Sequence, residues 1–509
     1  MERRKDGLGM KANRLGRRDL LRAGAGLLFA SAAASANPTS SGPGVLARSY
    51  ATNQPARADV TVRIGTGLVE IAPQRILSTV TYNGQFPGPL LRLREGRRIT
   101  VDIYNDTDSP EQLHWHGQLV PPDVDGAAEE RTPYIPAHGM RRISFVPRPS
   151  GFRFYHTHLR GGSNLHRGQY TAQVGPVYIE STHEAGAYDR EVFLVLKEFE
   201  PYLSRGGDMA QDFISPATQA KDLVAKGESA MRASLARGMP RGYEVNYRLF
   251  TINGKMLGHG EPVRVKQGER VMFHVLNGSA TEIRSLALPG HRFRVMALDG
   301  NPVPKPAELP VLWLGTAERV SAIVEMTHPG VWVMGDLDDD DRSRGMGIVV
   351  EYAGRSGKPQ WVAPPAAGWD YTLFGSEHQT AVKPDEILEM TFAKDNAAEH
   401  GFNRWTINGV AFSEEKMEAM FHLKHGKRYR LQMRNASDDI HPVHLHRHTF
   451  EVTKYAGKQT SGVMKDVVMV GGYQEVEIDF NADDPGLTLF HCHQQLHMDF
   501  GFMALFDYV

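Results

Sequence analysis

The sequence predicts an all-β protein built from three β-sandwich domains in tandem. Glycine (51 residues) and proline (30 residues) are abundant, and long stretches with helical periodicity are scarce, which is typical of a β-rich fold with many turns. A segment pattern also occurs three times at domain-sized intervals. We therefore expect domains at residues 55–183, 184–355 and 370–509, each large enough to enclose a hydrophobic core.

The repeated segment starts with an Asn-Gly pair and continues to a glycine, an alternating run of eight residues and an asparagine. The three copies run from Asn83 to Asn105, from Asn253 to Asn277 and from Asn408 to Asn435. The second glycine and the last asparagine are nine residues apart in every copy. Each copy predicts a turn, a strand with period-two alternation and a second turn.

One segment departs from this β pattern. Residues 217–237 are rich in Ala, Lys and Glu, so we expect a helical insertion in the second domain, with surface decoration as its simplest role.

The first 36 residues have the composition of an export signal. The stretch RRDLLR from Arg17 to Arg22 resembles a twin-arginine signal, residues 23–33 form a short apolar run, and residues 34–36 offer small side chains for cleavage. A disordered basic tail is the alternative. The apolar run is too short to span a bilayer, so we expect a periplasmic or secreted protein with no membrane span after signal removal.

The overall charge speaks against nucleic acid as a partner. The chain has 58 Lys and Arg against 59 Asp and Glu, with a formal net charge of −1. Nucleic-acid-binding domains normally carry a strongly basic patch. We expect a monomer whose partners are small molecules.

Histidines gather in four tight groups near the two ends of the expected mature chain. The ten residues are His114, His116, His156, His158, His441, His444, His446, His491, His493 and His497. Alternate residues of a strand point to the same face. Four pairs with i, i+2 spacing can therefore present eight imidazoles to one cleft, four from the first domain and four from the third. Eight nitrogen ligands are too many for one metal but suit three.

Cys492 is the only cysteine of the chain and lies between His491 and His493. Its side chain should therefore point away from theirs, toward His441 and His497. One thiolate with two imidazoles is the ligand set of a blue electron-transfer copper. A buried structural thiol is the simpler alternative. Zinc is the competing metal, but zinc has no redox chemistry and leaves the arrangement around Cys492 without a purpose.

These motifs resemble those of the multicopper oxidases, a family that includes laccases, ascorbate oxidase, bilirubin oxidase and cuprous oxidases. The resemblance covers the mature chain and implies three cupredoxin-like Greek-key β-sandwich domains. It also implies four coppers per chain: one type 1, one type 2 and two type 3.

By position, the resemblance assigns every ligand. His114 and His444 would bind the type 2 copper; His116, His156 and His493 one type 3 copper; His158, His446 and His491 the other; and His441, Cys492 and His497 the type 1 copper. The second domain has none of these motifs and is expected to be scaffold.

The sequence departs from the family at two places. The position of the axial type 1 ligand is Phe502, which cannot coordinate, so we expect a three-coordinate type 1 copper of raised potential. Met498 and Met503 lie nearby but out of register. Some relatives carry an acid directly after the last histidine, where this chain has Met498. Asp125, which resembles a family aspartate, and then Asp499 are the candidate proton donors, although ordinary structural roles are the alternative for both.

The resemblance implies an enzyme that couples one-electron oxidation of phenols or aromatic amines at the type 1 copper to four-electron reduction of dioxygen to water at the trinuclear cluster. The residues with a predicted catalytic role are Cys492, His491, His493, Asp125 and Asp499. The alternatives are a periplasmic cuprous oxidase for copper tolerance, a copper store without turnover, and a copper-free envelope scaffold.

Overall fold

The computed structural model describes residues 57–181, 188–205, 242–376 and 382–509. The expected export signal at residues 1–36 and the expected helical insertion at residues 217–237 lie outside these ranges. Within the described residues, none of the helices combines the length and the apolar character that crossing a bilayer would require.

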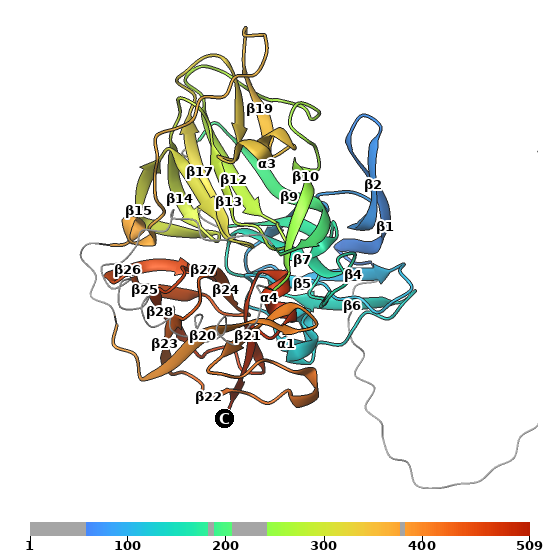
Figure 1. Ribbon diagram of the computed structural model, residues 1–509, viewed down its shortest axis with the longest axis vertical. Helices are drawn as coiled ribbons and strands as arrows, with labels where there is room; N and C mark the ends of the chain where they lie inside the picture. The colour runs from blue at the N-terminus through green and yellow to red at the C-terminus, as the bar shows by residue number, and fades with distance from the viewer. Residues whose placement is uncertain (1–56, 182–187, 206–241, 377–381) are drawn as a thin grey trace, which may run out of the picture. The chain divides into compact units, whose positions relative to one another are not determined.

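Six β-sheets form three sandwiches along the chain (Figure 1). In the first sandwich, one sheet has the order β2 (Arg75–Tyr82), β1 (Val60–Ala72), β4 (Ile99–Asn105), β6 (Met140–Phe145). The other has the order β3 (Leu91–Arg94), β8 (Val174–Glu180), β7 (Gly151–His156), β5 (His114–His116).

The second and third sandwiches are larger versions of the same plan. One sheet of the second sandwich has the order β10 (Glu244–Ile252), β9 (Arg190–Ser204), β12 (Arg270–Asn277), β17 (Arg319–Glu325), β14 (Phe293–Leu298), β15 (Asn301–Leu309). Its other sheet has the order β11 (Val263–Val265), β19 (Gly347–Tyr352), β18 (Val331–Gly335), β13 (Arg284–Ala287), β16 (Val311–Leu314). One sheet of the third sandwich has the order β21 (Phe402–Ile407), β20 (Glu386–Glu399), β23 (Arg428–Asn435), β28 (Glu475–Asn481), β25 (Phe450–Tyr455), β26 (Lys458–Lys465). Its other sheet has the order β22 (Phe421–Leu423), β30 (Met503–Tyr508), β29 (Thr488–Cys492), β24 (His441–Leu445), β27 (Val467–Val470).

Helices in the described residues are short and lie between strands. They are α1 (Pro122–Asp125), α3 (Asp339–Ser343), α4 (Gln495–Asp499) and the 3-10 turns η1 (Ala128–Glu130), η2 (Gly168–Tyr170), η3 (Tyr371–Phe374) and η4 (Glu414–Lys416). The all-β prediction is confirmed.

The threefold sequence repeat is a structural repeat. The alternating runs are strands β4, β12 and β23, and each pairs in parallel with the first long strand of its sandwich, β1, β9 or β20. In each Asn-Gly pair both residues have positive φ, as the asparagine (φ 52 to 53°) and the glycine (φ 72 to 78°) of a tight hairpin turn require. The asparagine side chain also accepts a backbone N–H of that first long strand, at 2.7 to 2.8 Å.

The last asparagine of each copy closes the loop that follows its strand. The Asn105 side chain donates to the carbonyl of Ser109, and the Asn435 side chain donates to that of Asp439. Asn277 makes the equivalent hydrogen bond to Glu282. Since a buried loop must satisfy its backbone groups, the asparagine is fixed by the loop geometry, which explains its constant spacing.

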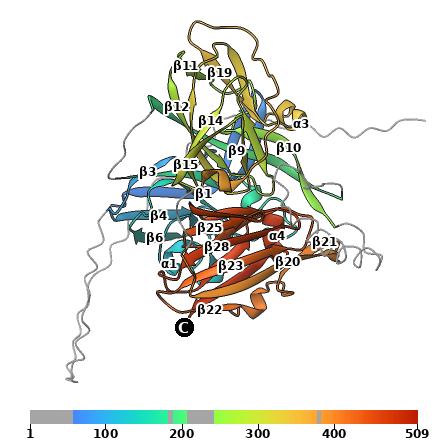
Figure 2. The ribbon, with the colours of Figure 1, turned by 90° about the vertical axis from the view of Figure 1, so that its left-hand side faces the viewer.

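The three sandwiches are joined by shared apolar packing in the described residues. One apolar cluster contains Phe154 of the first sandwich, Leu276 and Ala317 of the second and Val467 of the third. Figure 2 shows the third sandwich, in red and orange, against strands of the other two. This packing brings β5 and β7 of the first sandwich opposite β24 and β29 of the third.

Candidate metal centre

Strand pairing aligns the histidine pairs within each sandwich. In the first, β5 pairs with β7 so that His114 lies opposite His156. In the third, β24 pairs with β29 so that His444 lies opposite His491. Because alternate side chains share a face, the partner two residues along each chain points into the same space.

The structure brings all eight paired histidines together, and all eight are buried. Their ring nitrogens form three groups, each with donor atoms within 4.8 Å of one another: His114, His116 and His444; His116, His156 and His493; His158, His446 and His491. Each group contains histidines from both the first and the third sandwich, as the spacing predicted.

The inward nitrogens face one another across this space. His156 Nε2 lies 3.4 Å from His116 Nδ1 and 3.4 Å from His493 Nε2. His491 Nε2 lies 3.0 Å from His446 Nε2. Among the described residues, the Nε2 atoms of His114 and His444 have no hydrogen-bond partner. Buried nitrogens are normally satisfied, so this many inward-facing acceptors indicates a site built for cations.

The outward nitrogens of six of these rings are held by oxygen atoms. Three rings donate from Nδ1 to backbone carbonyls: His156 to Thr157, His491 to Cys492, and His444 to Asp466. His114 and His446 both donate from Nδ1 to Asp125 Oδ2. His116 donates from Nε2 to Asp466 Oδ1. Such outer hydrogen bonds fix the tautomer and orientation of metal-binding histidines.

Burial also keeps six of the eight rings neutral. It lowers the pKa of His156, His444 and His493 well below 6.5, and it does the same for His116, His446 and His491. A neutral imidazole with one nitrogen tied to an oxygen offers the other as a lone pair, which is the form that binds a metal.

Cys492 lies with His441 and His497 on the other side of the β29 backbone. The Cys492 Sγ atom is 3.6 Å from His441 Nδ1 and 3.5 Å from His497 Nδ1, and the two nitrogens are 3.0 Å apart. Three donors bound to one metal at about 2.0–2.3 Å lie roughly 3–4 Å apart. Burial raises the pKa of the Cys492 thiol, and metal coordination would displace its proton.

Phe502 and the two nearby methionines occupy different environments. The Phe502 ring is fully buried and lies 4.6 Å from the His441 ring, centroid to centroid. Met498 and Met503 instead pack in a separate apolar cluster with Leu489. Of these three residues, Phe502 is thus the one whose packing against the His441 ring is established.

A tryptophan that the motifs did not reveal covers His497. The Trp405 ring stacks on the His497 ring with centroids 4.1 Å apart, and its indole N–H donates to Asp439 Oδ2 at 2.9 Å. His497 is only 1% exposed in consequence. An isolated tryptophan more than 90 residues away in the sequence carries no signal of this contact.

A cavity of about 680 Å³ opens beside the end of α4. Phe402 and Phe500 stack with ring centroids 4.4 Å apart at its wall, and Arg160 and Glu414 form an ion pair of 3.0 Å there. Phe500 is three residues from His497, and its carbonyl accepts from the Trp405 backbone N–H at 3.0 Å. Phe500 therefore links the cavity wall to Trp405, which stacks on His497.

The two predicted acids differ in their contacts. Asp125 Oδ2 lies between His114 Nδ1 (3.0 Å) and His446 Nδ1 (2.9 Å), so it bridges the first and third sandwiches. Asp499 accepts instead from the backbone N–H of Gly161 and Gly162 and from Gln495. Burial raises the pKa of Asp499 to about 7.

Three family models match the chain, each described as multicopper oxidase: one at residues 65–184, one at 217–349 and one at 379–509. The chain belongs to the multicopper oxidase family. It is therefore an oxidoreductase that uses oxygen, and its family implies copper as the metal. The nitrogen and sulfur donors described above fit that ion.

Known multicopper oxidases and related proteins align with much of the chain. "Multicopper oxidase MmcO" of Mycobacterium tuberculosis is 29% identical, and the match covers 97% of each chain. Bilirubin oxidase of Albifimbria verrucaria is 25% identical over 84% of this chain and 72% of its own. A copper resistance protein A homolog of Pseudomonas syringae is 28% identical over 49% of this chain and 44% of its own. Among solved structures, a multi-copper oxidase from Pseudomonas thermotolerans shares the fold, with a TM-score of 0.65 and 23% identity over 89% of this chain and all of that one.

Gly126, directly after Asp125, allows the first sandwich to close around His114. Its φ is +99°, and a Cβ atom there would lie 1.9 Å from the Leu113 carbonyl oxygen. We expect Gly126→Ala to lower the free energy of unfolding by about 2–5 kcal/mol, from backbone strain and overpacking together. Gly96→Ala is the matched control, since Gly96 also has positive φ (+75°) but has no atom within 4 Å of the added carbon. Equal losses for both variants in denaturant titrations would contradict this account.

Glu111 gives the stability of the protein a pH dependence. Its side chain is 4% exposed, and burial raises its pKa from 4.5 to about 7. Between these two values the folded carboxyl keeps its proton while the unfolded one releases it, so stability falls as pH rises, by up to about 3 kcal/mol. Glu111→Gln lacks this loss. We expect the variant to gain stability relative to wild type between pH 5 and pH 8 in denaturant titrations; parallel curves would contradict the prediction.

Proposed function

We propose that this multicopper oxidase takes single electrons from small phenols or aromatic amines at the Cys492 site and delivers them to dioxygen at the eight-histidine site, with water as the product. The observation that carries this proposal is that Cys492 lies between His491 and His493 on one backbone segment, with its sulfur on one side and their rings on the other.

We propose four coppers per chain. His441, Cys492 and His497 would hold the type 1 copper, and His114 and His444 the type 2 copper. The type 3 pair would be held by His116, His156 and His493 and by His158, His446 and His491. The three donor groupings and the two unpartnered Nε2 atoms support this assignment. When bound, copper supplies one-electron redox chemistry and a binding site for dioxygen.

The chain itself provides two short routes between its two sites. Cys492 is bonded through the backbone to His493, which faces the histidine cluster. The Cys492 carbonyl also accepts a hydrogen bond from His491 Nδ1 at 2.9 Å. Both routes are short and buried in the described structure.

Asp125 is our first choice for the group that holds and passes a proton. Its Oδ2 atom orients His114 and His446, while its Oδ1 atom is buried and has no hydrogen-bond partner among the described residues. That oxygen can take up a proton next to the rings of the site. Both Asp499 oxygens are already engaged, which favours a positioning role for that residue.

Aromatic donors suit the cavity beside α4. The stacked Phe402 and Phe500 rings offer a flat apolar surface, and Arg160 can face a phenolate. A donor seated there would reach the Trp405 and His497 stack through Phe500, and its electron would enter along this path. Because electron transfer forms no bond to the substrate, we expect loose selectivity among small aromatic reductants.

A cuprous oxidase for copper tolerance is the second candidate, and the likeness to the copper resistance protein A homolog favours it. Soft Cu(I) is gathered by thioether groups. The 20 methionines of this chain are dispersed in its sequence, and Met417, Met420 and Met433 form no more than a loose group, which argues for the aromatic donors. A copper-free envelope scaffold is disfavoured because every ligand position is filled.

One preparation tested with three donors decides between these candidates. Dioxygen uptake is followed with a phenol, an aromatic amine and Cu(I) at matched concentrations. We expect the two organic donors to exceed Cu(I) in kcat/KM. A higher value for Cu(I) would contradict the proposed substrate class and support the copper-tolerance role.

We also propose that residues 1–36 direct export by the twin-arginine route to the periplasm or medium, that the remaining domains span 55–183, 184–355 and 370–509, and that the mature protein is a monomer. The sequence pattern of the leader and the six sheets support the first two statements. The N-terminal sequence of the exported protein tests the first.

A further inference from the structure

We propose that Arg319 of the second sandwich positions two histidines of the metal centre by holding Asp466 between them. The sandwich without metal-binding motifs would then contribute to the centre. This inference rests on the ligand assignment proposed above, and it names three positioning residues that the motifs do not include: Arg319, Asp466 and Arg153.

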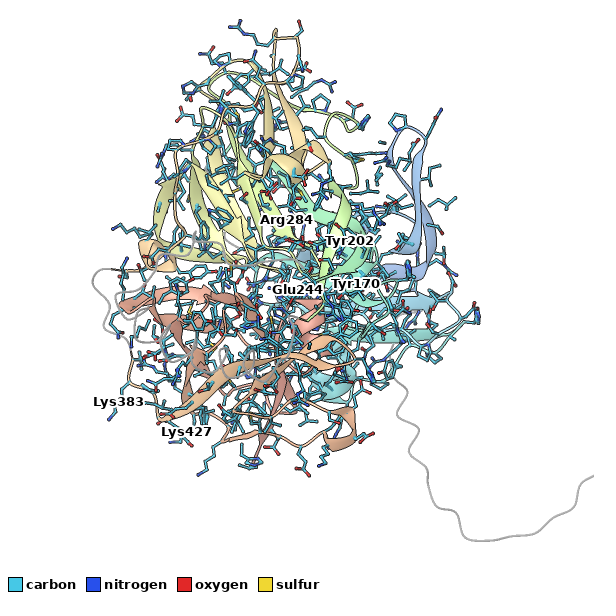
Figure 3. The ribbon with its side chains drawn as sticks, viewed as in Figure 1. Tyr170, Tyr202, Glu244, Arg284, Lys383 and Lys427 are labelled. Atoms are coloured by element: carbon cyan, nitrogen blue, oxygen red, sulfur yellow. The ribbon has the colours of Figure 1, made fainter. Side chains whose placement is uncertain are left out.

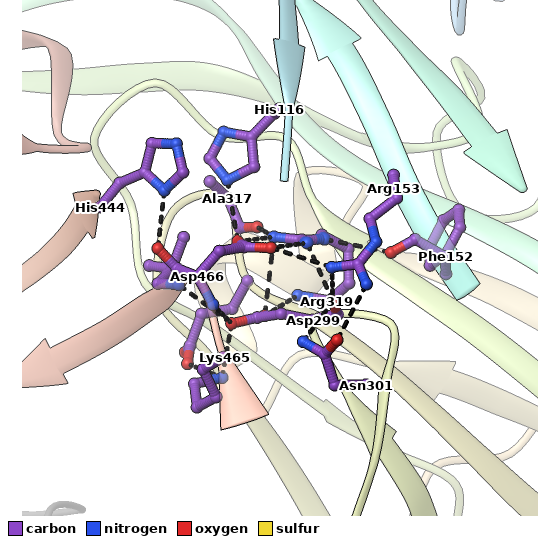
Figure 4. A network of polar contacts seen from close by, with 12 residues as sticks. His116, Phe152, Arg153, Asp299, Asn301, Ala317, Arg319, His444, Lys465 and Asp466 are labelled. Carbon is purple, nitrogen blue, oxygen red and sulfur yellow. Dashed lines mark hydrogen bonds and ion pairs between the residues drawn. The ribbon is translucent and has the colours of Figure 1, made fainter. Parts of the chain in front are cut away.

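Asp466 contacts two ligand histidines with two different oxygens. It lies between β26 and β27, where its Oδ1 atom accepts from His116 Nε2 at 3.1 Å and its backbone carbonyl accepts from His444 Nδ1 at 2.6 Å (Figure 4). The two rings, from different sandwiches, stack with centroids 3.8 Å apart and an angle of 18° between their planes.

These two hydrogen bonds give the stacked rings opposite tautomers. His116 uses Nε2 to reach Asp466, which leaves Nδ1 to face His156 Nε2 at 3.4 Å. His444 uses Nδ1, which leaves its Nε2 atom without a partner among the described residues. One aspartate therefore decides which nitrogen each ring offers to a metal.

Arg319 holds that aspartate with both arms of its guanidinium. Its Nη1 lies 2.7 Å from Asp466 Oδ1, and its Nη2 lies 2.6 Å from Asp466 Oδ2. Arg153 of the first sandwich adds a hydrogen bond of 3.1 Å to Oδ2. All three side chains are fully buried. A two-pronged contact of this kind fixes the plane of the carboxylate as well as its charge.

Arg319 is itself held in place by hydrogen bonds to residues of the first and second sandwiches. It donates to the carbonyls of Ala317 (2.9 Å) and Asp299 (3.1 Å) in the second sandwich, and to that of Phe152 (3.3 Å) in the first. The Asp299 carboxylate accepts from the Arg319 backbone N–H at 3.0 Å and pairs with Lys465 of the third sandwich at 2.9 Å. The guanidinium therefore has little freedom to move.

Gly117, directly after His116, leaves the space that this pair occupies. Its φ is +74°, and a Cβ atom there would lie 2.5 Å from Asp466 Oδ2 and 2.8 Å from Arg319 Nη2. The glycine thus lets the ion pair approach the backbone of β5, close to the ligand it orients.

Arg319→Lys tests the inference, because lysine keeps the charge but cannot bind both oxygens in one plane. Arg284→Lys is the matched control: Arg284 (Figure 3) is an equally buried arginine of the second sandwich that pairs with Glu198 and Asp341, and it has no contact with these histidines. Asp466→Asn, which is close in shape, is the second test variant.

Each copper-loaded variant is titrated with a chelator while the type 1 absorption and the type 2 paramagnetic signal are recorded separately. For Arg319→Lys and Asp466→Asn we expect the type 2 copper to be lost at about 10- to 100-fold lower chelator concentration and its signal to change shape, with the type 1 absorption retained. Arg284→Lys should leave both titrations unchanged.

If the chelator titration of Arg319→Lys matched that of the wild type, the role of Arg319 would be overturned, even if Asp466→Asn lost its type 2 copper more easily. Equal impairment of Arg284→Lys would show a general stability effect and would also overturn it. Absence of a type 2 signal from wild type would contradict the proposed function itself, so the two failures are distinguishable.

Discussion

Replacing Cys492 by serine is expected to abolish the blue absorption and reduce turnover with every reducing substrate to the background. Cys492 supplies the sulfur that lies 3.6 Å from His441 Nδ1 and 3.5 Å from His497 Nδ1, and it is the covalent start of both routes to the histidine cluster. The loss should exceed the roughly 100-fold that removal of an outer hydrogen-bond partner can cost. The measurement is dioxygen uptake together with an absorption spectrum.

The matched control for this variant is Met498→Leu. Met498 is equally buried and lies six residues away, but it packs in the apolar cluster with Leu489 and Leu505 rather than with the sulfur site. We expect near-normal colour and turnover. A Cys492→Ser protein that keeps a substantial fraction of wild-type turnover would exclude Cys492 as the point where electrons enter.

Replacing Asp125 by asparagine should slow dioxygen reduction by about 10- to 100-fold. Asparagine cannot accept from both His114 and His446 and also pass a proton, since one of its two terminal atoms is an amide nitrogen. Turnover and copper content are measured on the same sample. Asp123→Asn in the same short helix is the control, because Asp123 is exposed.

The copper content separates two ways in which Asp125→Asn can fail. Slow turnover with a full copper complement supports a role in proton transfer, and loss of copper supports a role in orienting the rings. Full turnover with all coppers bound would remove Asp125 from the mechanism.

The repeat and the histidine pairs could be predicted because both are local in sequence. The constant interval between glycine and asparagine in each repeat reflects one strand and its closing loop, as the side-chain hydrogen bonds of Asn105, Asn277 and Asn435 explain. The i, i+2 spacing of the histidines follows from strand alternation alone. Neither inference required knowledge of how the domains pack.

The supporting residues could not be predicted because their partners are distant in the sequence. Arg319 and Asp466 are 147 residues apart, and Trp405 meets His497 only after β21 and α4 have packed. Buried arginine or aspartate has no local signature, since such residues are usually exposed. Of the repeated strands, β23 shows the expected alternation between buried and less buried side chains most clearly. In β12 most residues are buried on both faces, because aromatic side chains such as Phe152 and Tyr178 of the first sandwich cover His274.

Metal analysis combined with absorption and electron paramagnetic resonance spectra tests the central claim most directly. The account predicts four coppers per copper-loaded chain, an intense blue band without the signature of an axial thioether, and a separate type 2 signal. A colourless protein, or one that binds copper at the histidine cluster but not at Cys492, would contradict it.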